Sequence, residues 1–317
     1  MGNGKNYNAG IDVLKVLACI GVVLAHFGRD VKVATLSVPI FMFVSAYLCG
    51  RLFTEGSWKD LFSRLKRLYI PFFAWGIIYY LALSVVNKDF DICVLGSQLM
   101  VGAPACPVLY FLFLLMCYSV ILFVIAHIRL KFVVLFLLFA ACLLLQYSGL
   151  NVAFFSRFNF DLKMVLGRFV ELFPPAIMGL IFFLVEKSIK RSDVCCVIAC
   201  IAIVFYCISI SDIFVMKCTG FSYQGLPLLI GAVGISVLVL EGFGCACVRG
   251  SVYVGGGIHY VAQLTPGVYY IHLIVGKMLE MAIGCQRGWI EAMAVFSGSI
   301  IFTLVMRKIR YIGCIVK

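Results

Sequence analysis

Charged side chains are scarce in this sequence. Only 13% of its 317 residues are Asp, Glu, Lys or Arg, and 64% are hydrophobic, whereas soluble domains contain about 25% charged and about 45–50% apolar residues. The mean hydropathy is +1.10. This composition excludes an ordinary soluble domain and predicts a polytopic membrane protein.

Acidic residues are scarcer than basic ones, with 14 Asp and Glu against 26 Lys and Arg, and the net charge is +12. A charge of this size can indicate nucleic-acid binding, but here the basic residues stand in short runs between apolar segments, such as RLKRLY (64–69) and EKSIKR (186–191). Because a soluble basic domain is lacking, we expect no binding to nucleic acid. The runs instead follow the positive-inside rule of membrane proteins.

Patterns that hold metals or redox centres are also lacking. The 15 cysteines are scattered through apolar segments without a CxxC pair, and we interpret them as small hydrophobic residues of the core. The chain has only 4 histidines, and no carboxylate-rich cluster accompanies any of them. We therefore expect no metal site and no bound cofactor.

Long apolar runs are abundant, and ten of them approach the roughly 20 residues that a membrane-spanning helix needs. The first is expected to be a retained helix rather than a signal peptide, because no small-residue cleavage site follows it. No linker or repeat divides the chain, which predicts one bundle and a single domain over residues 1–317. The ten segments cover residues 9–28, 33–53, 68–87, 107–126, 132–149, 169–186, 194–212, 225–241, 264–283 and 289–306.

The basic residues between these segments favour one orientation. With the N-terminus inside, the predicted cytoplasmic segments contain sixteen Lys and Arg residues, and the predicted external segments contain eight. An even number of crossings returns the C-terminus to the same side. The sequence therefore predicts an all-α bundle of about ten transmembrane helices with both termini in the cytoplasm.

Three ionisable residues interrupt the first segment, AGIDVLKVLACIGVVLAHFG: Asp12, Lys15 and His26. From Lys15 to His26 an α-helix turns by about 20° net and rises about 16.5 Å, and Asp12 lies within roughly 40° of His26, so all three share one face. Such groups face the bundle interior or a water-filled cavity rather than lipid. A structural interpretation stays open, in which Asp12 and Lys15 form an ion pair and His26 contacts headgroups.

A second polar stripe lies in the ninth segment, where LTPGVYYIHLIV places Thr265, Tyr269 and His272 on one helix face. Two histidines within the membrane, each on a polar stripe, favour an acid/base site. The other two, His127 and His259, fall in a basic turn and a glycine-rich loop and are expected to be solvated.

Two longer cytoplasmic loops are expected, over residues 54–67 and 242–263. The first contains Arg64 and Arg67, one helical turn apart. Topology alone accounts for these cations, but guanidinium groups also pair bidentately with phosphate, so binding of an anionic cytosolic donor stays open. The second contains three consecutive glycines at 255–257, which favour a flexible turn over a phosphate site.

Together these residues resemble the integral-membrane acyltransferase 3 family of sugar and polysaccharide O-acyltransferases. IDVLKVLACIGVVLAH has the family's basic residue followed eleven positions later by His, and SVPIFMFVSAYLCGRLF resembles V-P-x-F-F-x-x-S-G-Y-L. RLKRLYIPFFAW, PVLYFLFLLMCYSV and YYIHLIV resemble the R-x-x-R-x-x-x-P-F, L-W-F-L and Y-L-x-H motifs. The resemblance covers most of the chain. Three positions depart from the pattern, with Lys15 for Arg, Ala46 for Gly and Tyr110 for Trp.

The resemblance implies a multi-pass enzyme of the cell membrane that moves an acyl group, most often acetyl from acetyl-CoA, to a hydroxyl of an envelope carbohydrate or glycolipid. The donor could also carry a succinyl group. The sequence does not choose between direct transfer and a covalent acyl-enzyme intermediate. A transporter or flippase for a sugar or lipid-linked glycan is the alternative function. The expected site residues are Lys15, Arg64 and Arg67 for the donor, His26, His272 and Tyr269 for catalysis, and Asp12, Ser45, Tyr47 and Thr265 in support.

Overall fold

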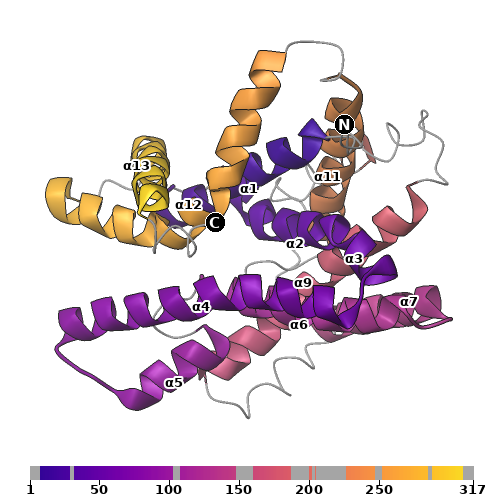
Figure 1. The fold of residues 1–317 in the computed structure, drawn as a ribbon, viewed down its shortest axis with the longest axis horizontal. Helices are drawn as coiled ribbons and strands as arrows, with labels where there is room; N and C mark the ends of the chain where they lie inside the picture. The colour runs from indigo at the N-terminus through magenta and orange to yellow at the C-terminus, as the bar shows by residue number, and fades with distance from the viewer. Residues whose placement is uncertain are drawn as a thin grey trace. The chain divides into compact units, whose positions relative to one another are not determined.

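The computed structural model describes residues 8–28, 32–102, 108–147, 160–186, 200–201, 204, 226–246, 252–284 and 288–309 (Figure 1). All regular elements within these residues are helices, as the sequence predicts. They are α1 (Ala9–Phe27), the 3-10 helix η1 (Lys32–Leu36), α2 (Ser37–Leu48), α3 (Gly50–Glu55), α4 (Trp58–Asn87), α5 (Ile92–Val101), α6 (Tyr110–Ala126), α7 (Lys131–Tyr147), α9 (Phe160–Val185), α11 (Leu226–Ala246), α12 (Val252–Ile283) and α13 (Trp289–Lys308).

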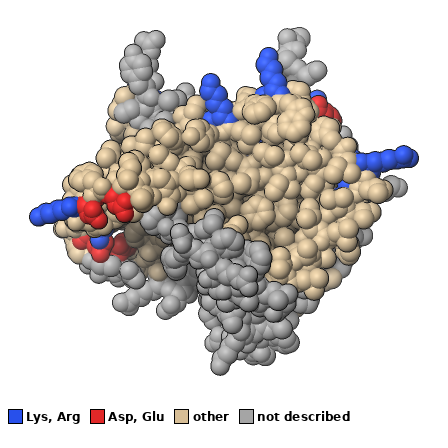
Figure 2. All heavy atoms as spheres, turned by 90° about the horizontal axis from the view of Figure 1, so that it is seen from below, with Lys and Arg blue, Asp and Glu red and all other residues tan. Residues whose placement is uncertain are grey.

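Four helical segments of the described residues are long and apolar enough to cross a membrane: Ala9–Phe27, Trp58–Asn87, Met164–Val185 and Trp289–Lys308. Large apolar side chains such as Leu81, Phe136 and Ile301 are exposed. On the face in Figure 2, residues other than Lys, Arg, Asp and Glu cover most of the described surface. Apolar surface of this extent suits contact with lipid, so the chain is a helical membrane protein.

Two predicted loops are largely helical, and this part of the prediction is wrong. α4 begins at Trp58 because Ser57 and Asp60 form a capping box, with Ser57 N donating to Asp60 Oδ2 at 2.9 Å and Asp60 N to Ser57 Oγ at 3.3 Å. α12 begins at Val252 and runs through the three glycines at 255–257. The 10 residues of α5 also occupy a stretch that the sequence left as an external loop. Segment 194–212 lies almost wholly outside the described residues.

The described helices form two compact units. The first contains α1, η1, residues 37–44 of α2, α11, α12 and α13. The second contains the end of α2, then α3 to α7 and most of α9. The expectation of a single domain stays a prediction.

In the first unit, α1 and α12 pack parallel to each other. Their contacts follow in ascending order along both helices: Asp12 with His259, Cys19 with the carbonyl of Thr265, and His26 with His272. α13 packs antiparallel to α12, with Gly267 against Thr303 and Val275 against Gly298. At Gly267 a Cβ would overlap the Thr303 side chain, so glycine allows this close approach.

Proline interrupts α12 at residue 266, and the chain compensates locally. Pro266 has no N–H, so the carbonyl of Ala262, four residues earlier, loses its helical donor. The Thr265 hydroxyl donates to that carbonyl at 2.9 Å. Thr265, which the sequence assigned to site support, therefore repairs the helix that carries His272.

In the second unit, α4 packs antiparallel to α6 (Figure 1). Trp58 lies against Phe123 with ring centroids 4.8 Å apart, and Arg64, further along α4, reaches Ser119, which is earlier on α6. α9 joins this unit through Gln146, whose side chain donates to the Val170 carbonyl at 2.9 Å. Pro174 leaves this carbonyl without its helical donor, so Gln146 replaces the missing N–H.

Candidate active site

His26 and His272 lie beside each other in the first unit, with ring centroids 5.2 Å apart and planes inclined at 43°. His26 stands in the last turn of α1, where it is exposed, and His272 stands within α12, where it is 0% exposed. The structure therefore brings together the two histidines that sequence reasoning placed on separate polar stripes.

The hydrogen bonds of His272 define the state of its ring. Nδ1 lies 2.8 Å from the backbone carbonyl of Tyr269. A carbonyl only accepts, so Nδ1 carries a proton, and in the neutral ring Nε2 is left as an acceptor. Nε2 is buried and has no hydrogen-bond partner among the described residues. A buried acceptor of this kind requires a functional explanation, because leaving it unpaired costs free energy.

Aromatic side chains surround the histidine pair. Phe27 meets His272 edge-on with centroids 6.4 Å apart, and Tyr269 lies 6.0 Å from the same ring. Phe41 of α2 packs edge-on against Tyr269 at 6.2 Å. Phe27 packs directly against Gly276, where a Cβ would overlap the Phe27 ring. Tyr269 contributes its ring and its backbone carbonyl to the pair.

Lys15 and Asp12 form the ion pair that the structural interpretation expects, with Lys15 Nζ 3.3 Å from Asp12 Oδ1. The other carboxylate oxygen, Oδ2, lies 2.7 Å from Nδ1 of His259. Asp12 is 5% exposed, whereas the His259 side chain is 48% exposed. His259 is exposed, as the sequence predicts, but it lies in α12 rather than in a loop and also contacts Asp12. His259 stands 13 residues before His272, and Asp12 stands 14 before His26, so the parallel packing of α1 and α12 brings both pairs into contact.

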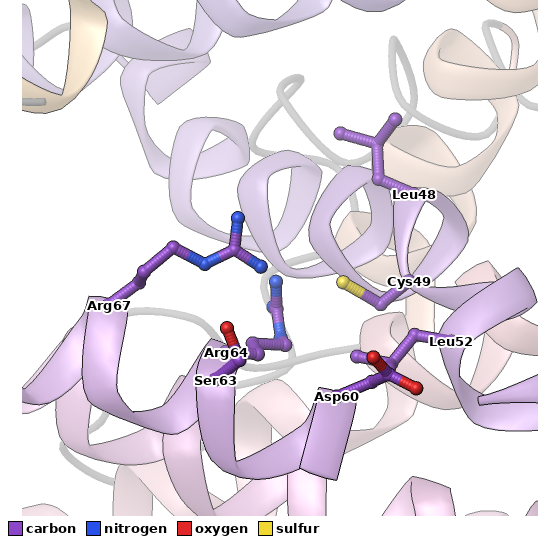
Figure 3. Close-up of a pocket in the computed structure, with 7 residues that line it drawn as sticks. All are labelled: Leu48, Cys49, Leu52, Asp60, Ser63, Arg64 and Arg67. Carbon is purple, nitrogen blue, oxygen red and sulfur yellow. The ribbon is translucent and has the colours of Figure 1, made fainter. Parts of the chain in front are cut away.

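A pocket of about 360 Å³ in the second unit contains the two predicted donor arginines, whose guanidinium groups point into it (Figure 3). Arg64 is fixed there, because Nε donates to Ser119 Oγ and Nη2 donates to Ser45 Oγ, each at 3.0 Å. Arg67 is exposed and has no hydrogen-bond or ion-pair partner among the described residues. The pocket is lined by Leu48, Cys49, Leu52, Asp60, Ser63, Arg64 and Arg67.

Asp60 is the acidic residue in this lining, and its carboxylate is engaged by the helix cap. Oδ2 accepts from the backbone N–H of Ser57 at 2.9 Å and from the Ser57 hydroxyl at 2.7 Å. Two arginines against one engaged carboxylate leave the pocket with a positive charge. Such a pocket is suited to a phosphate or another anion.

Three predicted residues remain to be placed: Tyr47, Ser45 and Lys15. Tyr47 packs against Phe182 and Phe183 of α9, with centroids 5.7 and 6.2 Å apart. Ser45, as described, accepts from Arg64. Lys15 belongs to the first unit and the two arginines belong to the second.

Membrane-spanning helices that carry a histidine pair and a cationic pocket define an integral-membrane protein with a candidate acid/base site. The model of the acyltransferase 3 family, described as an acyltransferase domain, matches residues 8–308, and the chain belongs to this family. It is therefore an acyltransferase, as the motifs of the sequence indicated. No curated protein and no solved structure matches the chain.

Proposed function

We propose that the protein is a membrane O-acyltransferase that moves an acyl group, most often acetyl, from cytosolic acyl-CoA to a hydroxyl of an envelope carbohydrate or glycolipid. The observation that carries this proposal is the contact between His26 and His272, at 5.2 Å between ring centroids, in a chain of the acyltransferase 3 family. Acyl-CoA is a substrate in this proposal, and no resident cofactor is required.

The donor is proposed to bind by its phosphates in the arginine pocket. Arg64 is held by two serine hydroxyls, so its guanidinium is already oriented before the donor arrives. Arg67 is available for a direct contact with phosphate. Lys15 of the first unit is the other cation proposed to contact the donor.

His26 is proposed to act on the acceptor. As base, it takes the hydroxyl proton while the acceptor oxygen attacks the thioester carbon. The C–S bond then breaks, and CoA leaves as the thiol after receiving a proton. As acyl carrier, His26 instead attacks the thioester carbon, the C–S bond breaks, and CoA leaves as the thiol with the proton lost by the ring. The acceptor hydroxyl then attacks the acyl-imidazole, the C–N bond breaks, and the hydroxyl proton returns to His26. His272 has its proton on Nδ1, so its free Nε2 accepts rather than donates. This favours a role in orienting His26 over a role as oxyanion donor.

The enzyme is proposed to lie in the cell membrane with about ten transmembrane helices and both termini in the cytoplasm. The parallel packing of α1 and α12 supports this topology. Counted as the first and ninth of ten alternating spans, these two helices cross the membrane in the same direction.

Transfer of labelled acetyl from acetyl-CoA to envelope glycans tests the proposal, in membranes with the wild-type protein, His26→Ala or no added protein. We expect transfer by wild type and a loss of about 10²–10⁴-fold in His26→Ala at equal protein level. Equal transfer by both would contradict the proposed site. Movement of a glycan across vesicles without transfer from acetyl or succinyl donors would instead favour a transporter.

The covalent route has a separate test. A brief pulse of labelled donor without acceptor should leave label on the wild-type protein, and none on His26→Ala, if His26 carries the acyl group. Direct transfer predicts no trapped label on either protein.

A further inference from the structure

Ser119 of α6 is a buried serine whose hydroxyl group is engaged as both donor and acceptor, and its side chain is 2% exposed. Oγ donates its proton to the carbonyl of Leu115, one turn earlier in α6, at 2.6 Å. A hydroxyl group has one proton, so toward Arg64 this oxygen can only accept, and Nε of Arg64 donates to it at 3.0 Å. The Leu115 carbonyl thus fixes the direction in which Ser119 offers a lone pair.

The bond to Ser119 decides which part of Arg64 is left for a ligand. Of the five N–H donors of a guanidinium group, Arg64 uses the one on Nε for Ser119 and one on Nη2 for Ser45. Nη1 is accessible and makes no hydrogen bond with a described residue. The terminal edge, with N–H groups on both Nη1 and Nη2, therefore remains available in the pocket (Figure 3). Such an edge can contact two oxygens of one phosphate group.

Arg64 has a competing partner in its own helix. Asp60 stands four residues earlier in α4 and lines the same pocket. An acidic residue four positions before a basic one is the favourable arrangement for an ion pair on a helix. These two residues form no ion pair here, because Asp60 accepts from Ser57 while Arg64 donates to Ser119 and Ser45. A guanidinium group that turned to Asp60 would be neutralised and less available to an anion.

We infer that Ser119 is a positioning residue for the acyl-CoA donor: by accepting from Nε, it holds Arg64 away from Asp60 and leaves the terminal edge of the guanidinium group for a donor phosphate. This inference rests on the proposed function, in which the arginine pocket binds the donor. Nε is the guanidinium nitrogen nearest the side-chain stem, so a bond at Nε fixes the plane of the whole group. Ser119 acts from a buried position and does not line the pocket itself.

The test is the affinity of the purified full-length protein for CoA, together with KM and kcat for acetyl-CoA in membranes. Ser119→Ala removes the acceptor, Ser119→Cys replaces it with a weak acceptor of similar size, and Ser119→Thr keeps the hydroxyl group. We expect Ala and Cys to weaken CoA binding and raise the donor KM by about five- to tenfold, since a hydrogen bond to a charged group is lost. Thr should stay within about threefold of wild type, and kcat within about twofold in all three.

Two double-mutant cycles separate this role from a purely structural one. In the Arg64→Ala background, Ser119→Ala should cause no further loss of CoA affinity, because Ser119 acts through Arg64. Asp60→Asn removes the competing charge but keeps an oxygen that can accept from Ser57. It should raise CoA affinity by at most about twofold in the wild-type protein and by about fivefold in Ser119→Ala, where Asp60 is free to draw Arg64 away.

Ser236→Ala is the matched control. Ser236 of α11 is 0% exposed, and its hydroxyl group donates to the carbonyl of Ala232, four residues earlier, at 2.7 Å. This bond repeats the one between Ser119 and Leu115, but no arginine of the described residues donates to Ser236. Its loss should leave CoA affinity unchanged.

Three results would overturn the inference: an unchanged CoA affinity in Ser119→Ala and Ser119→Cys, a full further loss from Ser119→Ala in the Arg64→Ala background, or an equal gain from Asp60→Asn in both backgrounds. If Ser119→Ala does not accumulate in membranes, the comparison of Cys with Thr decides. Failure of the proposed function gives a different pattern. A wild-type protein that binds no CoA overturns both proposals, whereas CoA binding that needs Arg64 but not Ser119 overturns this one alone.

Discussion

Arg64 and Arg67 share one pocket but are held differently, and this difference predicts separable effects. Arg64 donates to Ser45 and Ser119, which belong to two other helices, whereas Arg67 has no partner among the described residues. Arg67→Ala should therefore weaken CoA binding by about tenfold with little change in thermal stability, because one charge-assisted contact is lost. Arg64→Ala should weaken CoA binding and also lower the free energy of unfolding by about 1–3 kcal/mol, since the hydroxyls of the buried Ser119 and the half-buried Ser45 lose their donor.

The measurement is CoA affinity and thermal unfolding of both variants in the same detergent. Arg64→Lys is the informative control, because a lysine keeps the charge but cannot reach both hydroxyls in the geometry of a guanidinium. The unfolding temperature of Arg64→Lys should therefore be close to that of Arg64→Ala. The unfolding temperature of Arg67→Lys should differ more from that of Arg64→Ala. Equal destabilisation by Arg67→Ala and Arg64→Ala would show that the assignment of roles is wrong.

His272 provides a second prediction at the scale of single residues. His272→Asn retains an N–H donor for the Tyr269 carbonyl but removes Nε2 beside His26. We expect normal folding and a fall in kcat of about 10²-fold, with the donor KM nearly unchanged, because an acid/base partner is lost rather than a binding contact. The measurement is steady-state transfer at varied acetyl-CoA. A raised donor KM with a normal kcat would place His272 in the donor site instead.

At the scale of helices, the pairing of Thr265 with Pro266 predicts a stability effect. Thr265→Val removes the hydroxyl that donates to the Ala262 carbonyl at 2.9 Å, and a buried acceptor then has no partner. The expected loss is about 1–2 kcal/mol in the free energy of unfolding. Thr265→Ser keeps the hydroxyl and should lose less.

The loss should disappear when the proline is also replaced. In Pro266→Ala the backbone N–H at 266 donates to the same carbonyl, so Thr265→Val becomes nearly neutral in that background. Thermal unfolding of the four proteins measures this coupling. An equal cost of Thr265→Val in both backgrounds would mean that the hydroxyl does not replace the missing N–H.

Helices also show how far the sequence is predictive. α1 was expected at 9–28 and occupies Ala9–Phe27, because a long apolar run determines a buried helix. The start of α4 is missed because hydropathy marks the apolar part of a helix and not its polar first turns. The start of α12 is missed because the three glycines at 255–257 favour a turn. The Ser57–Asp60 cap was the local signal for α4. The contact of Asp12 with His259 could not be predicted, because it depends on how two distant helices pack.

For the whole molecule, the direction of each crossing is the remaining prediction. α4 has 30 residues and is about 45 Å long, which exceeds the roughly 30 Å of a hydrocarbon core. Its first turns carry Lys59, Lys66 and Arg67, so we expect them on the cytoplasmic side. Its last residue, Asn87, is then expected outside.

Cysteine labelling on intact cells measures this direction. Asn87→Cys should react with a membrane-impermeant maleimide above the level of the parent protein, which keeps its own 15 cysteines. Lys59→Cys should react only after permeabilisation. The reverse pattern would contradict a cytoplasmic N-terminus, since α4 is the third predicted span.

The parallel packing of α1 and α12 allows a second labelling test of the predicted topology. Two helices in an alternating bundle are parallel when an odd number of spans separates them, and ten predicted spans leave seven between these two. That count includes segment 194–212, outside the described residues. Two further variants each add one cysteine: Asn8→Cys lies before α1, and Gln263→Cys lies in the first half of α12. In both variants the added cysteine should react only after permeabilisation. Labelling of the second from outside would remove one span from the count and would be incompatible with parallel packing within one unit.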